Sequence, residues 1–121
     1  MEGFFFGDIN QTTEQNSNYR QVLATTPTMQ LVVMSLIPGE DIGEEVHPYT
    51  TQFIRIETGT GLAVINNKWY QLFDGVALVI PPNTLHNIIN TSATGCLRLY
   101  TLYSPPNHPR DRLDVTKPEH D

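Results

Sequence analysis

Metal-competent side chains gather in one stretch, GEDIGEEVHPYTTQFIRIETG, which runs between glycines at positions 39 and 59. Glu45 and His47 are two residues apart, so in an extended strand their side chains share one face. Gln52 opens a run in which apolar residues recur at every second position, and this alternation predicts a half-buried strand with Gln52 facing inward. A carboxylate, an imidazole and an amide are therefore expected to face one apolar interior.

Neighbouring residues are expected to lie outside this interior. Glu44 is adjacent to Glu45 in the chain, so its side chain should point outward into solvent. Arg55 falls on the strand face opposite Gln52, where it is expected to contact a neighbouring strand or subunit. Trp69 follows a hairpin turn and is expected on the outer face or at an interface.

Length, charge and cysteine content limit the classes of protein to consider. The chain has 121 residues, enough for one domain with a core, and its formal net charge is -6. Because no cluster of Lys or Arg is present to neutralise phosphates, small molecules or proteins are expected as partners and nucleic acid is not. The single cysteine, Cys96, excludes an internal disulfide and is expected to be a small buried residue rather than a catalytic thiol.

No part of the sequence indicates a membrane segment or an export signal. There is no long apolar run, so no transmembrane helix is expected. Residues 1–6 lack the basic region and the long apolar stretch of a secretory signal. The sequence therefore predicts a cytoplasmic protein without a membrane partner.

Short strands separated by turns follow one another along the chain. Asn66-Asn67 predicts a tight hairpin, because asparagine tolerates positive φ, and Asp74-Gly75 predicts another turn. The body shows no helical periodicity. Strands this short and evenly spaced are typical of an all-β sandwich or barrel, whose interior can hold one ligand. The predicted strands are residues 19–25, 29–37, 52–57, 62–65, 68–73, 76–80, 86–90 and 96–103.

Both ends of the chain are expected to lie outside the barrel. Residues 1–28 provide a polar, irregular N-terminal arm and the first short strand, with Phe4 to Phe6 pinned to the body or to a neighbouring subunit. Residues 104–121 form a proline-rich tail that extends over the surface. In this tail His108 is expected to be exposed rather than folded over the pocket as a lid, and His120 is expected to be disordered.

Two motifs in the sequence resemble those of the cupin superfamily. In the first motif Glu and Gln stand where His and Glu are usual, and in the second Asn stands for an inner glycine, which a left-handed turn tolerates. The resemblance covers residues 29–103 and implies a small single-domain type-2 cupin: an all-β jelly roll, or double-stranded β-helix barrel. Such domains commonly pair into dimers. The first motif comprises Gly39, Glu45, His47, Gln52 and Gly59, and the second comprises Gly75, Pro81, Asn83, His86 and Asn90.

The resemblance also implies a metal site. Matched position by position, the ligands would be Glu45, His47, Gln52 and His86, a mixed nitrogen and oxygen set suited to one divalent transition metal: Fe, Mn, Ni, Co or Zn. Four protein ligands on a six-coordinate ion leave two positions for water or substrate. The alternative is a metal-free pocket whose polar residues hydrogen-bond to one another. No catalytic residue is assigned.

Tyrosines are the candidate residues of the substrate pocket. Tyr49 lies just beyond His47 on the same strand face, where it either donates a hydrogen bond to substrate or serves in packing. Tyr100 and Tyr103 lie on opposite faces of one strand, so one of them is expected to line the mouth of the barrel.

Two functions of different classes fit these residues. The first is a metal-dependent isomerase or dioxygenase acting on a small oxygenated substrate, namely a sugar, a sugar phosphate or an enediol. The ligand types are similar to those of mannose-6-phosphate isomerases, with the Glu and Gln in reverse order. The second is a non-catalytic module that binds or senses a sugar or an organic acid, with a structural metal or none. A homodimer is implied by the resemblance.

Overall fold

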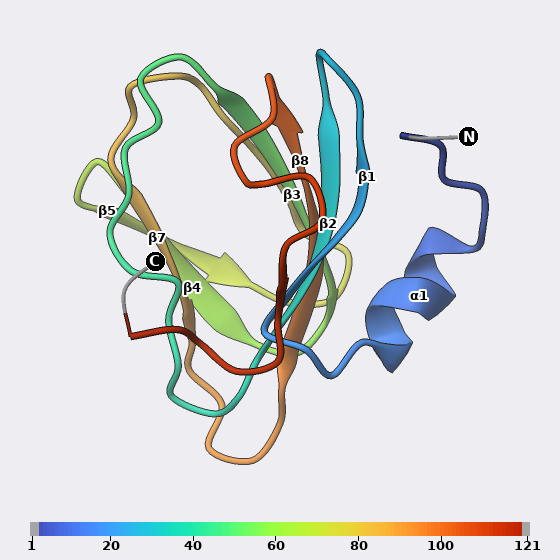
Figure 1. Cartoon of the computed structure of the whole chain (residues 1–121). Coiled ribbons are helices and arrows are strands. Elements are labelled where there is room, and N and C mark those ends of the chain that lie inside the picture. The colour runs from blue at the N-terminus through green and yellow to red at the C-terminus, as the bar shows by residue number, and fades with distance from the viewer. Residues whose placement is uncertain (1–2, 120–121) are drawn as a thin grey trace.

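The body of the molecule consists of two antiparallel sheets, seen in a computed structural model that describes residues 3–119 (Figure 1). The larger sheet has the strand order β6-β3-β8-β2-β1-β9, and the smaller has the order β5-β4-β7. The all-β class is confirmed, and each of the eight predicted strands from residue 19 to residue 103 is present with closely similar bounds, whereas the extended conformation expected at residues 45–47 is not a strand. The strands are β1 (Arg20–Thr25), β2 (Gln30–Leu36), β3 (Thr51–Thr58), β4 (Gly61–Ile65), β5 (Lys68–Leu72), β6 (Ala77–Ile80), β7 (His86–Asn90), β8 (Leu97–Ser104) and β9 (Leu113–Asp114).

The interior is apolar because alternate residues of the strands face it. In β3, Gln52, Ile54 and Ile56 are buried, whereas Arg55 between them is only half-buried on the outer face. Each fully buried Ile or Leu stabilises the fold by about 1.5–3 kcal/mol. The predicted alternation of this strand is confirmed, and it leaves one polar side chain, Gln52, among the apolar ones. The apolar core is completed from other strands by Val32, Met34, Leu36, Ala63, Leu72, Ile88, Leu97 and Leu99.

The loop between β2 and β3 runs along β7 and extends the smaller sheet. The N–H of Ile42 donates to the carbonyl of Ile88, and isolated bridges join Asp41 to Ile89 and Glu45 to His86. This pairing carries the first motif alongside the second. The hairpin predicted at Asn66-Asn67 joins β4 to β5, and both asparagines have positive φ, 49° and 66°.

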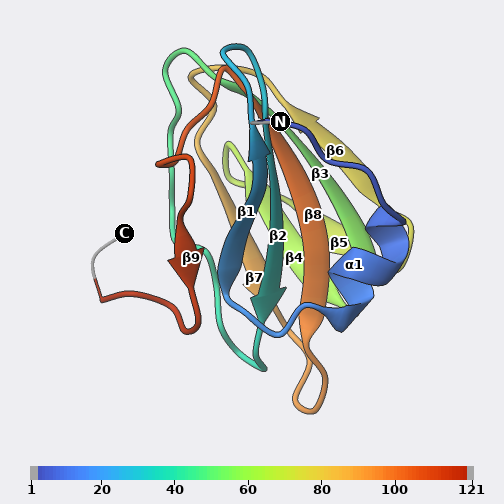
Figure 2. The ribbon, with the colours of Figure 1, turned by 45° about the vertical axis from the view of Figure 1, so that its right-hand side comes forward.

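A short helix, α1 (Ile9–Gln15), replaces the irregular arm expected near the N-terminus. Asp8 caps it by accepting a hydrogen bond from the N–H of Gln11 at 3.1 Å. The helix lies beside β8 (Figure 2). Thr13 is completely buried, and Arg98 of β8 donates to the carbonyl of Asn16 just after the helix. Capping and packing, rather than an apolar periodicity, therefore stabilise this short helix of polar sequence, which has about two turns.

The aromatic run before α1 is only partly held by the body. Phe4 and Phe6 are exposed, and Phe5 between them is half-buried. No helix among residues 3–119 is long and apolar enough to cross a membrane. His120 lies outside the described residues.

The C-terminal tail, which was expected to extend over the surface, also contacts both sheets. Its short strand β9 pairs with β1 and adds the sixth strand to the larger sheet. Further on, the Nζ of Lys117 donates to the carbonyl and to Oδ1 of Asp41, at 2.7 and 2.9 Å. Since Asp41 belongs to the loop along β7, the C-terminal segment connects the edge of the larger sheet to the edge of the smaller one.

Candidate metal centre

Glu45 and His86 are brought together by the backbone. The N–H of Glu45 donates to the carbonyl of His86 at 2.9 Å, and the N–H of His86 donates back at 3.0 Å. Two residues that exchange both hydrogen bonds in an antiparallel pair project their side chains to the same side. The loop along β7 thus sets the carboxylate of the first motif beside the imidazole of the second.

His47 joins this pair, although the extended strand predicted for residues 45–47 is wrong. Glu45 forms only an isolated bridge and His47 lies in no strand, because the chain turns at Pro48. The carbonyl of His47 instead accepts a hydrogen bond from the N–H of Asn83 at 2.8 Å. One ligand atom from each of Glu45, His47 and His86 lies within 4.8 Å of the others, a spacing that a single metal ion can bridge.

The imidazole of His86 is oriented as a ligand. Its Nδ1 lies 2.9 Å from the carbonyl of Thr84, which can only accept, so Nδ1 carries the proton. The Nε2 atom then presents a lone pair, and it is buried without a hydrogen-bond partner. A ring nitrogen that donates to a backbone carbonyl while the other stays open is typical of metal-binding histidines.

His47 is held in the neutral form that binds metal. Burial lowers the pKa of His47, and the nearby His86 ring lowers it further. The two rings are 5.2 Å apart, and Nε2 of His47 is 3.9 Å from Oε1 of Glu45. This Nε2 is likewise buried and accepts or donates no hydrogen bond.

Gln52 adds a buried amide oxygen to the two histidine nitrogens that make no hydrogen bond. The residue is 2% exposed, and its Nε2 donates to Oγ1 of Thr101 at 3.0 Å. Its carbonyl oxygen, Oε1, is buried and accepts no hydrogen bond. Along β8 the residue paired with Gln52 is Tyr103, whose ring packs edge-on against His47 with 5.9 Å between centroids. Gln52 therefore belongs to the same end of the interior as the histidines.

An open cleft of about 510 Å³ adjoins these residues. A volume of this size suits a small molecule. Glu44 is exposed at the rim, as expected, while Glu45 and His47 lie within. The residues that line the cleft are Glu44, Glu45, Val46, His47, Asn107, His108 and Arg112.

The structure brings one of the candidate tyrosines to the site. Tyr103 is buried and touches His47. Tyr100 points to the other face of β8, where its ring packs against Phe53. Tyr49 is 84% exposed and lines no part of the cleft, because the chain turns outward after His47.

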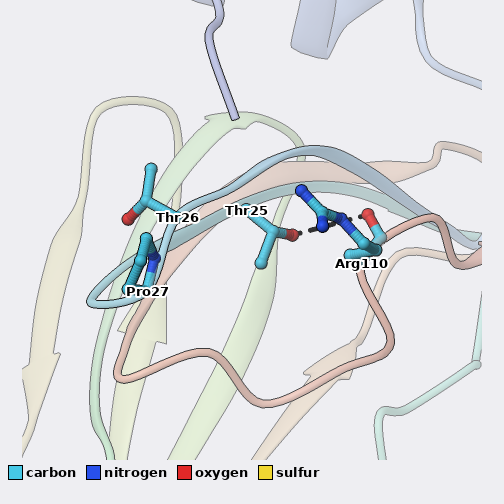
Figure 3. A pocket seen from close by; sticks show the side chains of 4 residues that line it. All are labelled: Thr25, Thr26, Pro27 and Arg110. Carbon is cyan, nitrogen blue, oxygen red and sulfur yellow. Dashed lines mark hydrogen bonds between the residues drawn. The ribbon is translucent and has the colours of Figure 1, made fainter. Parts of the chain in front are cut away.

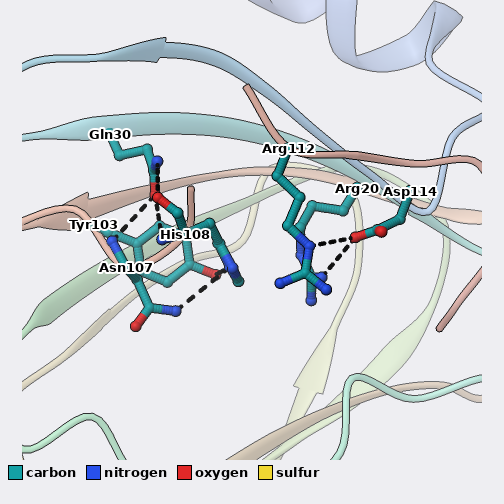
Figure 4. A network of polar contacts seen from close by, with 7 residues as sticks. All are labelled: Arg20, Gln30, Tyr103, Asn107, His108, Arg112 and Asp114. Atoms are coloured by element: carbon teal, nitrogen blue, oxygen red, sulfur yellow. Dashed lines mark hydrogen bonds and ion pairs between the residues drawn. The ribbon is translucent and has the colours of Figure 1, made fainter. Parts of the chain in front are cut away.

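His108 is not exposed in the way the sequence suggested. It is half-buried, lines the cleft and packs edge-on against Tyr103, with Nε2 3.4 Å from the tyrosine hydroxyl. Gln30, which is completely buried, holds its backbone. The amide oxygen of Gln30 accepts from the N–H groups of Asn107 and His108, and its Nε2 donates to the carbonyl of His108 (Figure 4).

The tail therefore supplies cleft residues that sequence reasoning assigned to the surface or did not single out. Asn107 and Arg112 received no role in the sequence analysis. The available signal was the run of prolines around His108, because proline restricts the backbone and makes a fixed segment less costly to order.

Other residues singled out by the sequence lie away from the cleft. Trp69 is 71% exposed on β5, and Arg55 faces outward from β3 beside Tyr100. Cys96 is half-buried, with no nucleophilic partner apparent among the described residues.

A second hollow lies at the β1–β2 turn. It is lined by Thr25, Thr26, Pro27 and Arg110, and the hydroxyl of Thr25 donates to the carbonyl of Arg110 (Figure 3). Its volume, about 500 Å³, is close to that of the cleft. It contains no carboxylate or imidazole, so it offers no metal-binding set.

Comparison with known proteins identifies the family. The family described as "Cupin domain" matches residues 32–103, which span β2 to β8 and include both motifs. The chain belongs to the cupin family. Its two sheets are accordingly those of a cupin jelly roll, and the cupin fold expected from the motifs is confirmed.

Relatives of this cupin occur in a virus and in bacilli. It is 45% identical to the uncharacterized protein L612 of Acanthamoeba polyphaga mimivirus over 93% of this chain and 72% of L612. It is 43% identical to the uncharacterized protein YrkC of Bacillus subtilis over 93% of this chain and 63% of YrkC. This cupin therefore spans less than two thirds of the length of YrkC.

A solved structure shares the whole architecture. The crystal structure of BH2720 from Bacillus halodurans has a TM-score of 0.89 and is 37% identical, with 93% of this chain and 89% of that chain covered. The coverage includes most of this chain beyond the matched domain, so the likeness is not limited to the central barrel.

Proposed function

We propose that this cupin is a metal-dependent enzyme, an isomerase or a dioxygenase, that acts on a small oxygenated substrate such as a sugar, a sugar phosphate or an enediol. One observation carries the proposal: Nε2 of His47, Nε2 of His86 and Oε1 of Gln52 are buried without hydrogen-bond partners. Each such atom costs roughly 1–3 kcal/mol if nothing binds it. A metal ion would satisfy all of them at once.

The donor set fits a divalent transition metal. Glu45, His47, Gln52 and His86 would hold the ion, which supplies Lewis-acid or redox chemistry when bound. The ligand atoms of the two histidines and Glu45 already lie within 4.8 Å of one another. A structure that keeps imidazole lone pairs buried and open is better explained by a ligand than by a purely structural role.

Residues of the cleft provide groups that can move a proton. His108 and Tyr103 are in contact, and His108 lies in the lining, so it can exchange a proton with a bound molecule. An isomerase needs such a group, whereas the sequence alone showed none beyond the metal ligands. The position of His108 therefore favours an enzyme over a passive binding module.

Elemental analysis of the purified protein tests the metal site. About one transition metal per chain is expected, because the four proposed donors would share one ion. His86→Ala should lose most of it, since the variant removes a buried donor. Glu44→Ala is the matched control, because this neighbouring carboxylate is exposed and should leave the metal content unchanged.

Absence of metal from the wild-type protein, even after reloading, would reject the metal-dependent enzyme and leave a small-molecule binding module. Equal loss of metal from Glu44→Ala and His86→Ala would reject the ligand assignment. If about one metal per chain is present, substrate screening should follow that metal's chemistry.

Pairing into a homodimer and a cytoplasmic location remain predictions. Light scattering tests the homodimer.

A further inference from the structure

The outer face of the larger sheet carries a row of apolar side chains that crosses the sheet from β6 to β1. Phe53 of β3 faces outward, because Gln52 and Ile54 on either side of it are buried. Residues directly opposite each other in adjacent strands share a face, so the register extends this row on both sides of Phe53. In spatial order the row consists of Val79, Phe53, Leu102, Leu31 and Ala24.

This apolar row is only partly covered by the chain itself. The N-terminal segment lies on the outer side of the larger sheet (Figures 1 and 2), and with Ala24 and Leu31 it lines a hollow at one end of the row. Phe5 is half-buried in that segment, whereas Phe6 is 91% exposed, and Val79 at the other end of the row is 68% exposed. Exposed apolar and aromatic side chains gathered on one face are typical of a surface that another protein covers.

Two opposite charges lie beside the row. Arg55 and Glu57 follow Phe53 on the outer face of β3, and both side chains are half-buried. Within residues 3–119 neither side chain makes a hydrogen bond or an ion pair, and Nε of Arg55 and Oε2 of Glu57 are buried without a partner. Partly desolvated charges are stabilised when an opposite charge meets them. The face therefore offers one cation and one anion, about 7 Å apart along the strand, to whatever covers it.

A second copy of the same chain meets both requirements. In a two-fold symmetric dimer a patch packs against the same patch of the partner, so it must complement itself in charge and in polarity. The apolar row can then cover the row of the partner. Arg55 of each protomer can pair with the partner's Glu57, which satisfies both charges. A partner surface of one sign would satisfy only one of them.

We infer that the outer face of the larger sheet is the interface of a two-fold symmetric homodimer, in which Phe6 and the apolar row are buried and Arg55 pairs with the partner's Glu57. The inference goes beyond the proposed function and does not depend on it. None of these residues lines the cleft, so the dimer needs no metal.

Reversal of the two charges, one at a time and together, tests the pairing. Sedimentation velocity over a wide range of protein concentration gives the dimer dissociation constant of wild type, Arg55→Glu, Glu57→Arg and the double variant. Lys68→Glu is the matched control, because it makes the same change as Arg55→Glu at an exposed position on β5, an edge strand of the smaller sheet. Melting temperatures show whether each variant keeps its fold.

The wild type should be a dimer. Each single reversal should raise the dissociation constant about a hundredfold or more, because it places like charges opposite each other at both symmetric contacts. The double variant should recover most of the wild-type affinity. A mixture of Arg55→Glu and Glu57→Arg should form a heterodimer, because one chain then presents two carboxylates and the other two guanidinium groups. Lys68→Glu should dimerise like the wild type.

The apolar part of the interface has its own test. Phe6→Ser should weaken the dimer at least tenfold, since it removes an aromatic side chain that the partner would bury. Trp69→Ser is the matched control, because Trp69 is an exposed aromatic residue of the smaller sheet, and this variant should dimerise like the wild type.

A wild-type protein that stays monomeric would overturn the inference. So would a dimer that neither charge reversal weakens, or two folded single variants that form no heterodimer when mixed. Equal weakening by Lys68→Glu would reduce the effect to net charge and overturn it as well. A monomer that carries metal would leave the proposed function intact, and a metal-free dimer would leave this interface intact, so the two can fail separately.

Discussion

The side-chain amide of Gln52 donates to the hydroxyl of Thr101 across 3.0 Å, from one inner strand to its neighbour. Both residues are almost completely buried. Because the NH₂ end of the amide is engaged there, the carbonyl end is fixed in place and left without a hydrogen bond. Thr101 therefore acts as the residue that orients a candidate metal ligand.

Gln52→Glu should separate the stability of the fold from its affinity for metal. A buried carboxylate is costly to desolvate, so we expect the free energy of unfolding of the metal-free variant to fall by about 3 kcal/mol. A carboxylate also binds a divalent ion more strongly than an amide does, so metal should bind at least as tightly and restore the lost stability. Denaturant unfolding with and without metal measures both effects.

Thr101→Val is the control for this change. It removes the acceptor of the Gln52 amide and leaves every candidate ligand in the chain, so metal affinity should fall only modestly. If Gln52→Glu were destabilised to the same extent with and without metal, Gln52 would not be a ligand.

Gln30→Leu should release the C-terminal segment from the cleft. Gln30 makes paired hydrogen bonds to the backbone of His108 and accepts a further one from Asn107. Leucine fills a similar volume but leaves these groups unsatisfied, so the free energy of unfolding should fall by about 2–3 kcal/mol. Limited proteolysis followed by mass spectrometry should show faster cleavage within residues 105–112.

Thr28→Ala is the control for this experiment. The carbonyl of Thr28, which the substitution keeps, accepts the hydrogen bond from the hydroxyl of Ser104 at the start of the tail. The cleavage rate of this variant should match the wild type. Unchanged proteolysis of Gln30→Leu would show that other contacts are sufficient to hold the segment over the cleft.

The barrel was predictable from sequence because its signals are local. Alternation in β3 and the asparagine hairpin between β4 and β5 each depend on a few adjacent residues. Gly59 in the first motif illustrates a constraint that only the fold explains: an added Cβ would lie 2.6 Å from the carbonyl oxygen of Cys96. The motif spacing thus reflects close contacts between strands as well as ligands.

The helix α1 and the course of the C-terminal tail could not be predicted, because they depend on tertiary contacts that leave little trace in the sequence. The helix α1 is polar and is stabilised by the cap at Asp8 and by burial of Thr13. The place of the tail is set by Gln30 and by the pairing of β9 with β1, both remote in sequence. For this reason the prediction that His108 is exposed was wrong, and Arg112 was not recognised from the sequence as a cleft residue.

Asn83→Val should disturb the position of His47. Asn83 has φ of 59°, as expected for a residue in the place of a motif glycine, and its N–H donates to the carbonyl of His47. A β-branched residue resists this backbone conformation, so the free energy of unfolding should fall by about 1–2 kcal/mol. Asn83→Gly should fold and bind metal like the wild type, and a Val variant with unchanged stability would refute the strain argument. Thermal unfolding and metal affinity are the measurements.

The contact between Asp41 and Lys117 should contribute to stability at neutral pH and be lost in acid. Hydrogen bonds from Asn87 and Lys117 lower the pKa of Asp41 below its usual value of 3.8, with the charge of Lys117 adding to the effect. A carboxyl whose pKa is lower in the folded state stabilises the fold above the unfolded pKa, and this contribution disappears as the pH falls through the folded pKa.

Asp41→Asn should therefore have a lower melting temperature than the wild type at pH 7, and the difference should shrink as the pH falls below about 3.8. Because Asp41 is well exposed, solvent screens the interaction and the difference at pH 7 should be small. Lys117→Met should lower the melting temperature in the same direction, since it removes the partner cation. Asp111→Asn, an exposed carboxyl of the same segment, controls for the change in net charge. A difference between wild type and Asp41→Asn that stayed constant down to pH 3 would show that ionisation of Asp41 is not what joins the tail to the smaller sheet.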